Sequence, residues 1–340
     1  MKSLHLALIS AFAGAVTIGT AHAGATLDAI KQRGEVNCGV STGVAGFSIA
    51  DSQGKYTGLD VDVCRAISAA IFGTGDKVKF FPLSAQQRFS ALQSGAVDLL
   101  SRNTTWTLTR DTALGLNFTV TTYYDGQGFM VPKKLGVKSA KELNGATVCV
   151  QPGTTTELNL SDYFRANKMT FKPVVISDLA EIEAAFFSGR CDVYTTDASG
   201  LASTRAVKAS NPDDYIILPE IISKEPLAPA VRHGDDEWFD IVKWAIYALI
   251  EAEEKGVNQA NVDQMKTSDD PVIKRLLGTT PGMGKALGLG EDWAYNELKA
   301  VGNYGDIFER NVGVKTPLKL PRGLNALWTS GGLIYAMPVR

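Results

Sequence analysis

The sequence predicts an α/β protein of two lobes, each built on an open sheet with helices packed against it. The chain has 340 residues, which is more than one hydrophobic core usually serves. Apolar residues make up 45% of the sequence and there are 33 glycines, a composition typical of α/β proteins rather than of disordered or coiled-coil chains. The third observation is a strand–helix pattern that occurs twice, so we expect one sheet for each copy.

The first 23 residues have the three-part pattern of a cleavable secretory signal. Lys2 is followed by the apolar run Leu4–Ile18 and then by the small-residue sequence Ala21-His22-Ala23, after which a signal peptidase would cut. The alternative is a misassigned start codon before an ordinary buried helix. No later segment approaches the roughly 20 apolar residues of a membrane span. We therefore expect a soluble mature chain in the periplasm.

The pattern first covers residues 35 to 101. Short apolar runs predict strands, and amphipathic segments predict helices. In order, the first copy consists of a strand over Glu35–Val40, a helix over Leu59–Phe72, a strand over Val78–Leu83, a helix over Gln86–Gln93 and a strand over Val97–Ser101. The second copy has the same order over Ala146–Gln151, Thr155–Arg165, Phe171–Ile176, Leu179–Phe187 and Cys191–Thr195.

The two copies match residue by residue where Ala91–Asn103 lies over Ala185–Asp197. Asn103 then overlays Asp197. Both would lie at the carboxyl ends of equivalent parallel strands, the edge at which open α/β sheets bind ligands. The alternative is that any two α/β domains share such turns and strand starts.

The repeat predicts the division of the chain. We expect a signal over residues 1–23, the first part of lobe 1 over 24–124, lobe 2 over 125–226, and a return to lobe 1 with a C-terminal extension over 227–340. The elements that support this division are a crossover over Tyr123–Pro132, a return over Ile221–Val231, a long helix over Trp238–Lys255 and short elements over Trp293–Val301 and Trp328–Tyr335.

The four cysteines stand at positions 38, 64, 149 and 191. Disulfides are expected in an oxidising compartment, and four cysteines allow three pairings. We favour Cys38 with Cys64 and Cys149 with Cys191, because a crossed pair would clamp the two lobes together. Buried free thiols are the alternative, since all four cysteines lie in apolar segments.

Composition argues against several function classes. The net charge is −2, with no basic run, so we expect no nucleic-acid partner. Of three histidines, only His233 lies beyond the signal, in a hydrophilic segment that we interpret as a solvated loop. A catalytic triad or a multi-histidine zinc site would have to be built around it. We expect no catalysis, no metal and no cofactor.

Several polar groups at the predicted sheet edges suit a zwitterion. Asn103–Arg110 carries four threonines and ends on Arg110, whose planar guanidinium can grip a carboxylate. Gly153–Glu157 opens a helix, where free backbone N–H groups favour a carboxylate, and Asp197 offers the negative charge that an ammonium needs. The alternatives are a surface arginine, an N-cap aspartate and N-cap threonines.

These residues resemble the polar amino-acid-binding proteins of ABC importers, the bacterial solute-binding protein family 3. The segments that carry the resemblance are Gly58–Ile67, Ser94–Asp98, Thr107–Arg110, Gly153–Thr155 and Asp197. Ser68 departs from the apolar residue more usual there. The resemblance covers about residues 27 to 255 and is strongest to the general L-amino-acid receptors and the glutamate/glutamine/aspartate/asparagine receptors. It implies the type II periplasmic binding fold, with two lobes joined by a two-strand hinge.

The resemblance also implies a ligand site. Arg110 would hold the α-carboxylate, and Asp197 with a carbonyl near Asn103 would hold the α-ammonium. The groups that would assist Arg110 are Thr105, Gly153, Thr154 and Thr155.

Phe47 would lie beside the ligand, although Val44 stands where many relatives carry an aromatic residue. Arg88 would reach an acidic ligand side chain, unless it is a solvated helix residue. Arg102 has no assigned role beyond attracting acidic ligands.

The function that follows is that of a monomeric periplasmic receptor. Its lobes would close on an L-amino acid, and permease subunits in the inner membrane would recognise the closed form. The alternatives are a sensory receptor and a periplasmic enzyme on the same fold, such as a dehydratase or a lytic enzyme.

Overall fold

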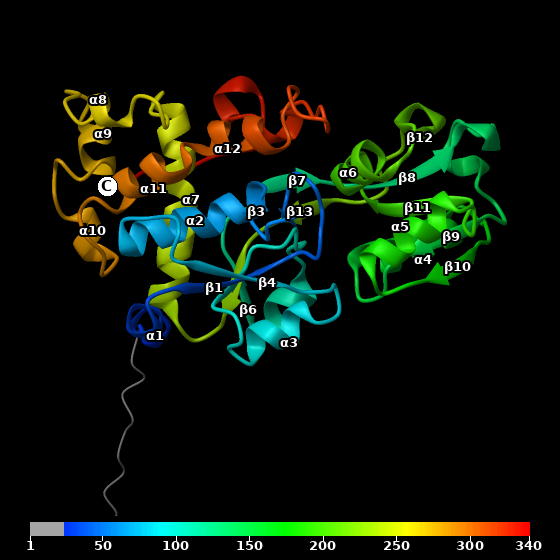
Figure 1. The fold of residues 1–340 in the computed structure, drawn as a ribbon, viewed down its shortest axis with the longest axis horizontal. Coiled ribbons are helices and arrows are strands. Elements are labelled where there is room, and N and C mark those ends of the chain that lie inside the picture. Colours follow the sequence, from blue (N-terminus) through cyan, green and yellow to red (C-terminus); the bar gives the residue numbers. More distant parts are fainter. Residues whose placement is uncertain (1–23) are drawn as a thin grey trace, which may run out of the picture.

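The computed structural model describes residues 24–340 and shows two lobes joined by narrow connections (Figure 1). The predicted secretory signal, residues 1–23, lies outside the described residues. Within residues 24–340, no helix has the length and apolar character needed to cross a membrane. The two-lobed α/β architecture predicted from the repeat is confirmed.

Lobe 1 contains a five-stranded sheet of order β4-β1-β5-β14-β6. Its strands are β1 (Val36–Val40), β4 (Val78–Pro82), β5 (Leu99–Leu100), β6 (Leu116–Phe118) and β14 (Ala230–Arg232). The first copy of the repeat supplies β1, β4 and β5, which are parallel, whereas β14 is antiparallel to its neighbours β5 and β6. The helices of this part are α1 (Ala25–Arg33), α2 (Leu59–Phe72) and α3 (Arg88–Gln93).

Lobe 2 repeats this arrangement with the order β10-β9-β11-β8-β12. Its strands are β8 (Gln127–Pro132), β9 (Thr147–Val150), β10 (Lys172–Val175), β11 (Val193–Asp197) and β12 (Tyr215–Ile217). The second copy of the repeat supplies the parallel strands β9, β10 and β11. The helices are α4 (Thr155–Ala166), α5 (Leu179–Phe187) and α6 (Ala198–Lys208). All the elements predicted for the two copies are present, with ends shifted by a few residues.

Two short antiparallel strands, β7 (Tyr123–Asp125) and β13 (Glu225–Leu227), run between the lobes. β7 continues into β8 of lobe 2, and β13 leads back to β14 of lobe 1. The expected two-strand hinge is therefore present, and it is where the chain enters and leaves lobe 2. A small hairpin of β2 (Ile49–Ala50) and β3 (Tyr56–Thr57) precedes α2.

The backbone at Gly58 explains where α2 begins. Gly58 has a φ of 136°, and a Cβ atom built there would lie 2.0 Å from the carbonyl oxygen of Phe47. Only glycine tolerates this conformation and this close approach. Asp60 and Asp62 follow in the first turn, where carboxylates interact favourably with the helix dipole.

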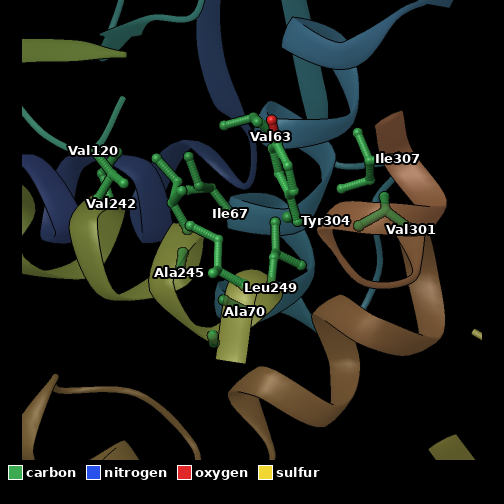
Figure 2. Packing of buried hydrophobic residues seen from close by; sticks show 14 of the residues in the cluster. Val63, Ile67, Ala70, Val120, Val242, Ala245, Leu249, Val301, Tyr304 and Ile307 are labelled. Carbon is green, nitrogen blue, oxygen red and sulfur yellow. The ribbon is translucent and has the colours of Figure 1, made fainter. Parts of the chain in front are cut away.

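The long helix α7 (Asp236–Glu254) forms the centre of the lobe 1 core. Figure 2 shows Val242, Ala245 and Leu249 of this helix beside Ile67 of α2 and Tyr304. The apolar residues Trp238, Ile241, Ala245, Leu249 and Ala252 recur at helical spacing along this helix, and all are buried. Helices of the C-terminal extension cover the same core: α8 (Val262–Met265), α9 (Pro271–Leu276), α10 (Met283–Ala286), α11 (Trp293–Val301) and α12 (Tyr304–Asn311).

The short element expected over Trp328–Tyr335 is only a 3-10 turn over Trp328–Ser330. The other short helical turns are η1 (Thr109–Ala113), η2 (Lys133–Leu135), η3 (Ala140–Glu142), η4 (Pro212–Asp214) and η5 (Gly323–Asn325).

Each disulfide lies within one lobe. Cys38 of β1 is bonded to Cys64 of α2, and Cys149 of β9 is bonded to Cys191 just before β11. No cysteine of residues 24–340 is free. The pairing favoured from the sequence is the one present. Each bond joins a central strand of one sheet to a neighbouring segment of the same lobe: β1 to α2, and β9 to the residues just before β11.

Candidate functional site

A cavity lies between the two lobes at the carboxyl ends of their parallel strands. Lobe 1 contributes Val44, Ala85, Arg88, Arg102, Asn103 and Thr105. Lobe 2 contributes Gln151, Thr154, Thr155, Thr156, Leu179, Glu183, Tyr194, Thr196, Asp197, Gly200, Ser203 and Thr204. Of the predicted ligand residues, the cavity brings together Arg88, Asn103, Thr105, Thr154, Thr155 and Asp197.

Asn103 lies just beyond β5 with an unusual backbone conformation. Its φ is 35°, a left-handed value that asparagine tolerates better than most residues. Its backbone N–H donates to Oδ2 of buried Asp60 at 2.8 Å, and burial raises the pKa of Asp60 to about 7. The side-chain oxygen Oδ1 of Asn103 is buried and has no hydrogen-bond partner within residues 24–340. Asn103 also lines the cavity, so this unsatisfied acceptor belongs to a residue of the cavity wall.

Asp197 ends β11 and occupies the N-cap position of α6, but its side chain makes no capping hydrogen bond. Its carboxylate is therefore not used to cap the helix. Burial raises the pKa of Asp197 well above its usual range, with the nearby carboxylates of Asp125 and Glu225 as further causes, and Arg88 and Arg110 oppose the shift. A buried carboxylate in this setting gains from a cationic ligand group.

Arg88, Arg102 and Arg110 together form a buried cationic group on lobe 1. Arg88 is 3% exposed and Arg110 is 7% exposed, so the alternatives of a solvated helix arginine and a surface arginine are wrong. Burial lowers the pKa of all three, and that of Arg102 falls to about 10. Arg88 and Arg110 lie over the ring of Phe89, with 4.7 and 5.1 Å from guanidinium carbon to ring centroid.

The three arginines differ in which of their N–H groups are hydrogen bonded within the protein. Nε of Arg102 donates to the carbonyl of Leu83 at 2.9 Å, and Nη1 of Arg110 donates to the carbonyl of Thr105 at 2.9 Å. Nε of Arg88 is buried without a partner in the part of the chain that the structure describes. Arg88 therefore lines the cavity with one of its donors unused.

Three of the expected ligand residues do not line the cavity. Phe47 is a core residue of lobe 1, where its ring meets that of Tyr123 edge to face; Val44 lines the cavity instead. The Gly153 N–H is already bonded to Oε2 of Glu157. Arg110 lies behind Thr105, to which it is hydrogen bonded.

The threonines at the start of α4 have two distinct roles. Thr154 is the N-cap residue, and its hydroxyl accepts the N–H of Glu157 at 3.1 Å. The hydroxyl of Thr155 instead points to Glu225 and donates to Oε2 at 2.8 Å. The N-cap alternative therefore holds for Thr154 and not for Thr155.

Glu225, on the hinge strand β13, was not expected from the sequence. Its buried carboxylate accepts hydrogen bonds from four side chains at 2.6 to 2.8 Å: Thr105, Thr155, Asn159 and Ser223. Thr105 belongs to lobe 1, whereas Thr155 and Asn159 belong to lobe 2. No local sequence signal marks Glu225, because it lies outside both copies of the repeat and three of its four partners, Thr105, Thr155 and Asn159, are distant in the chain.

The profile of the bacterial extracellular solute-binding proteins, family 3, matches residues 36–257. The chain belongs to this family. The match covers both sheets and the hinge, and ends just after α7, so the helices α8 to α12 are an addition to the part that the family shares.

Relatives of this family member match over almost their whole length. The general L-amino acid-binding periplasmic protein AapJ of Rhizobium johnstonii is 60% identical over 98% of this chain and 99% of its own. The glutamate/glutamine/aspartate/asparagine-binding protein BztA of Rhodobacter capsulatus is 56% identical over 97% and 99%.

The same fold is found in a solved structure. An ABC transporter periplasmic binding protein from Brucella ovis, with glutathione bound, is 57% identical and superposes with a TM-score of 0.91 over 93% of this chain and 99% of that one. The expected periplasmic binding fold is therefore confirmed.

Proposed function

We propose that this solute-binding protein is the periplasmic component of an ABC importer and binds L-amino acids, with a broad or an acidic and amide preference, between its lobes. The observation that carries the proposal is the cavity itself, in which Asp197 of lobe 2 faces the arginines of lobe 1. A zwitterion needs one charge of each sign at its two α-groups. The names of the relatives AapJ and BztA support the same ligand class.

In the proposed complex, the α-ammonium lies between Asp197 and the free Oδ1 of Asn103. The α-carboxylate lies beside Thr105, with Arg110 behind it and the start of α4 opposite, and the Thr105 hydroxyl donates to it in exchange for Glu225. Arg110 reaches the ligand by exchanging its bond to the Thr105 carbonyl. Gly153 and Phe47 support the loops and do not touch the ligand.

Lobe closure completes the site. The moving parts are residues 125–226 as lobe 2 and residues 24–124 with 227–340 as lobe 1, and the hinge is the β7–β13 pair. Closure excludes water and lowers the local dielectric, so each ion pair with the ligand becomes stronger. The closed form is the one that the permease subunits recognise.

No chemical step is proposed. The protein acts as a monomer without cofactor or nucleic acid, and residues 1–23 direct it to the periplasm. Incubation with labelled amino acids should return them unchanged, and a product would contradict the receptor function.

Thermal unfolding with each of the twenty amino acids, and with glutathione, tests the ligand class. A ligand at 100 times its Kd should add about 2.7 kcal/mol of stability. Asp197→Asn should abolish the shift for every amino acid while the chain stays folded. No shift with any of these compounds, checked by calorimetry, would contradict the proposal.

A further inference from the structure

The cavity continues past Asp197 into a groove between α5 and α6 of lobe 2. Leu179 and Glu183 line it from α5, four residues apart and therefore on one helix face. Gly200, Ser203 and Thr204 line it from α6. No part of the proposed α-group clamp uses these residues.

The groove ends on a buried pair of polar side chains. The hydroxyl of Thr204 donates to Oε1 of Glu183 at 2.7 Å, and both residues are buried. The other oxygen, Oε2 of Glu183, accepts no hydrogen bond from any residue between 24 and 340. A carboxylate oxygen that borders a cavity and lacks a partner is an acceptor for a ligand donor.

The spacing of Asp197 and Thr204 suits a ligand of defined size. Asp197 and Thr204 stand seven positions apart along α6, which is about 10 Å at 1.5 Å per residue. A glutamine whose α-ammonium and side-chain amide each make a hydrogen bond of about 3 Å covers a similar distance. Tyr194 also lines this cavity.

We propose that Glu183, hydrogen bonded to Thr204, contacts the end of the ligand side chain. It favours a side chain that donates a hydrogen bond, such as the amide of glutamine, over a carboxylate of the same length. The proposal rests on the proposed function, since it assigns the side chain of the ligand whose α-groups lie at Asp197. The free Nε of Arg88 on the facing lobe attracts the oxygen that amide and carboxylate side chains share.

The charge of Glu183 makes this preference depend on pH. Burial raises its pKa above the usual range, Asp178 at the start of α5 adds to the shift, and Thr204 and Lys208 of α6 oppose it. The other ionisable groups around the cavity are Tyr194 and Asp197 of β11 and Arg88 and Arg102 of lobe 1. A protonated Glu183 can donate to a ligand carboxylate, whereas an ionised one repels it. The preference for glutamine over glutamate should therefore rise with pH.

Calorimetric titration with glutamine and glutamate, on the mature chain with both disulfides intact, tests the proposal. The Kd ratio of the two ligands is measured at about pH 6 and about pH 8, where the side chain of free glutamate stays ionised. Glu183→Gln should lower the preference for glutamine by about tenfold at pH 8, the effect of one hydrogen bond to a charged group. It should also remove the pH dependence.

Two further variants complete the design. Glu181→Gln, on the exposed side of the same helix, is the matched control and should leave the ratio unchanged. Thr204→Val removes a hydrogen-bond donor that lowers the pKa of Glu183, so the preference for glutamine over glutamate should rise at a higher pH than in the wild type. This variant also tests the proposal if Glu183→Gln does not fold.

The outcomes separate the two proposals. Equal ratios in the wild type, Glu183→Gln and Thr204→Val at both pH values would overturn the role of Glu183 while leaving amino-acid binding intact. Failure of the wild type to bind either ligand, or any other amino acid, would overturn the proposed function.

Discussion

Thr105 of lobe 1 and Thr155 of lobe 2 donate their hydroxyl groups to the same oxygen, Oε2 of Glu225, at 2.6 and 2.8 Å. The two hydroxyls are themselves 3.3 Å apart. The carboxylate belongs to the hinge strand β13, so a single buried group connects both lobes and the hinge. Opening of the lobes would separate Thr105 from Thr155, and the carboxylate would lose at least one of its donors.

We expect Glu225→Gln to destabilise the protein by about 2 kcal/mol, because an amide nitrogen would face donors that now meet a carboxylate. The measurement is urea unfolding without ligand. Glu142→Gln, at an exposed position of lobe 2, is the control and should stay within about 0.5 kcal/mol of the wild type. Unchanged stability in Glu225→Gln would show that this network contributes nothing to the fold.

We expect Arg88→Ala to weaken the binding of acidic ligands about tenfold or more and the binding of neutral ligands much less. Arg88 lines the cavity and its Nε has no hydrogen-bond partner among residues 24–340, and a hydrogen bond to a charged group is worth about 1.5 to 3 kcal/mol. Calorimetry with aspartate, glutamate and alanine measures the difference. Arg190→Ala, exposed on lobe 2, should bind all three as the wild type does. An equal loss for all three ligands in Arg88→Ala would assign Arg88 to the α-groups instead.

Glu297 of α11 should make the stability of the protein fall as pH rises. Neither of its oxygens has a hydrogen-bond partner among residues 24–340, and burial raises its pKa well above the usual range. The unfolded chain releases this proton near pH 4.3, at about the pKa of free glutamate, whereas the folded chain retains it. The contribution of Glu297 is therefore complete below that pH and is lost progressively as pH rises through its folded pKa.

Glu297→Gln should remove this dependence. Urea unfolding at about pH 5 and about pH 8 should give a smaller difference in the variant than in the wild type, since one proton contributes about 1.4 kcal/mol per pH unit. Glu309→Gln, exposed on α12, should retain the wild-type difference. A variant that loses stability with pH as steeply as the wild type would contradict the assignment.

Asn325 should stabilise the hinge from the C-terminal extension, beyond the residues that the family shares. Its Oδ1 accepts the backbone N–H of Tyr124 on β7 at 2.6 Å, and its Nδ2 donates to the carbonyl of Tyr124 at 3.1 Å. Asn325→Ala leaves both groups of the hinge strand unpaired, so we expect a loss of about 1 to 3 kcal/mol. Asn325→Asp retains the acceptor and should lose less. Thermal unfolding measures both, and equal melting temperatures for the wild type and Asn325→Ala would contradict the role.

The sequence by itself determined the architecture. Apolar periodicity is a local property, so the helices α2 and α5 are predicted to the residue. The overlay of Asn103 on Asp197 predicts the edge at which the interlobe cavity lies, because strand ends are equivalent in a repeated unit. The intralobe disulfides also followed, since each pair lies within one copy of the repeat.

Only the tertiary structure decided which of these groups meet. Glu225 lies 120 residues from its partner Thr105. The sequence predicts Glu183 only as part of a helix, because the exposed side of a helix cannot be distinguished from a cavity wall without its neighbours. The resemblance places Phe47 beside the ligand, whereas its ring packs edge to face against Tyr123 in the core of lobe 1. Hydrogen bonds and burial between segments distant in the chain depend on how the elements pack, and the residue types in one segment do not identify such hydrogen-bond partners in another.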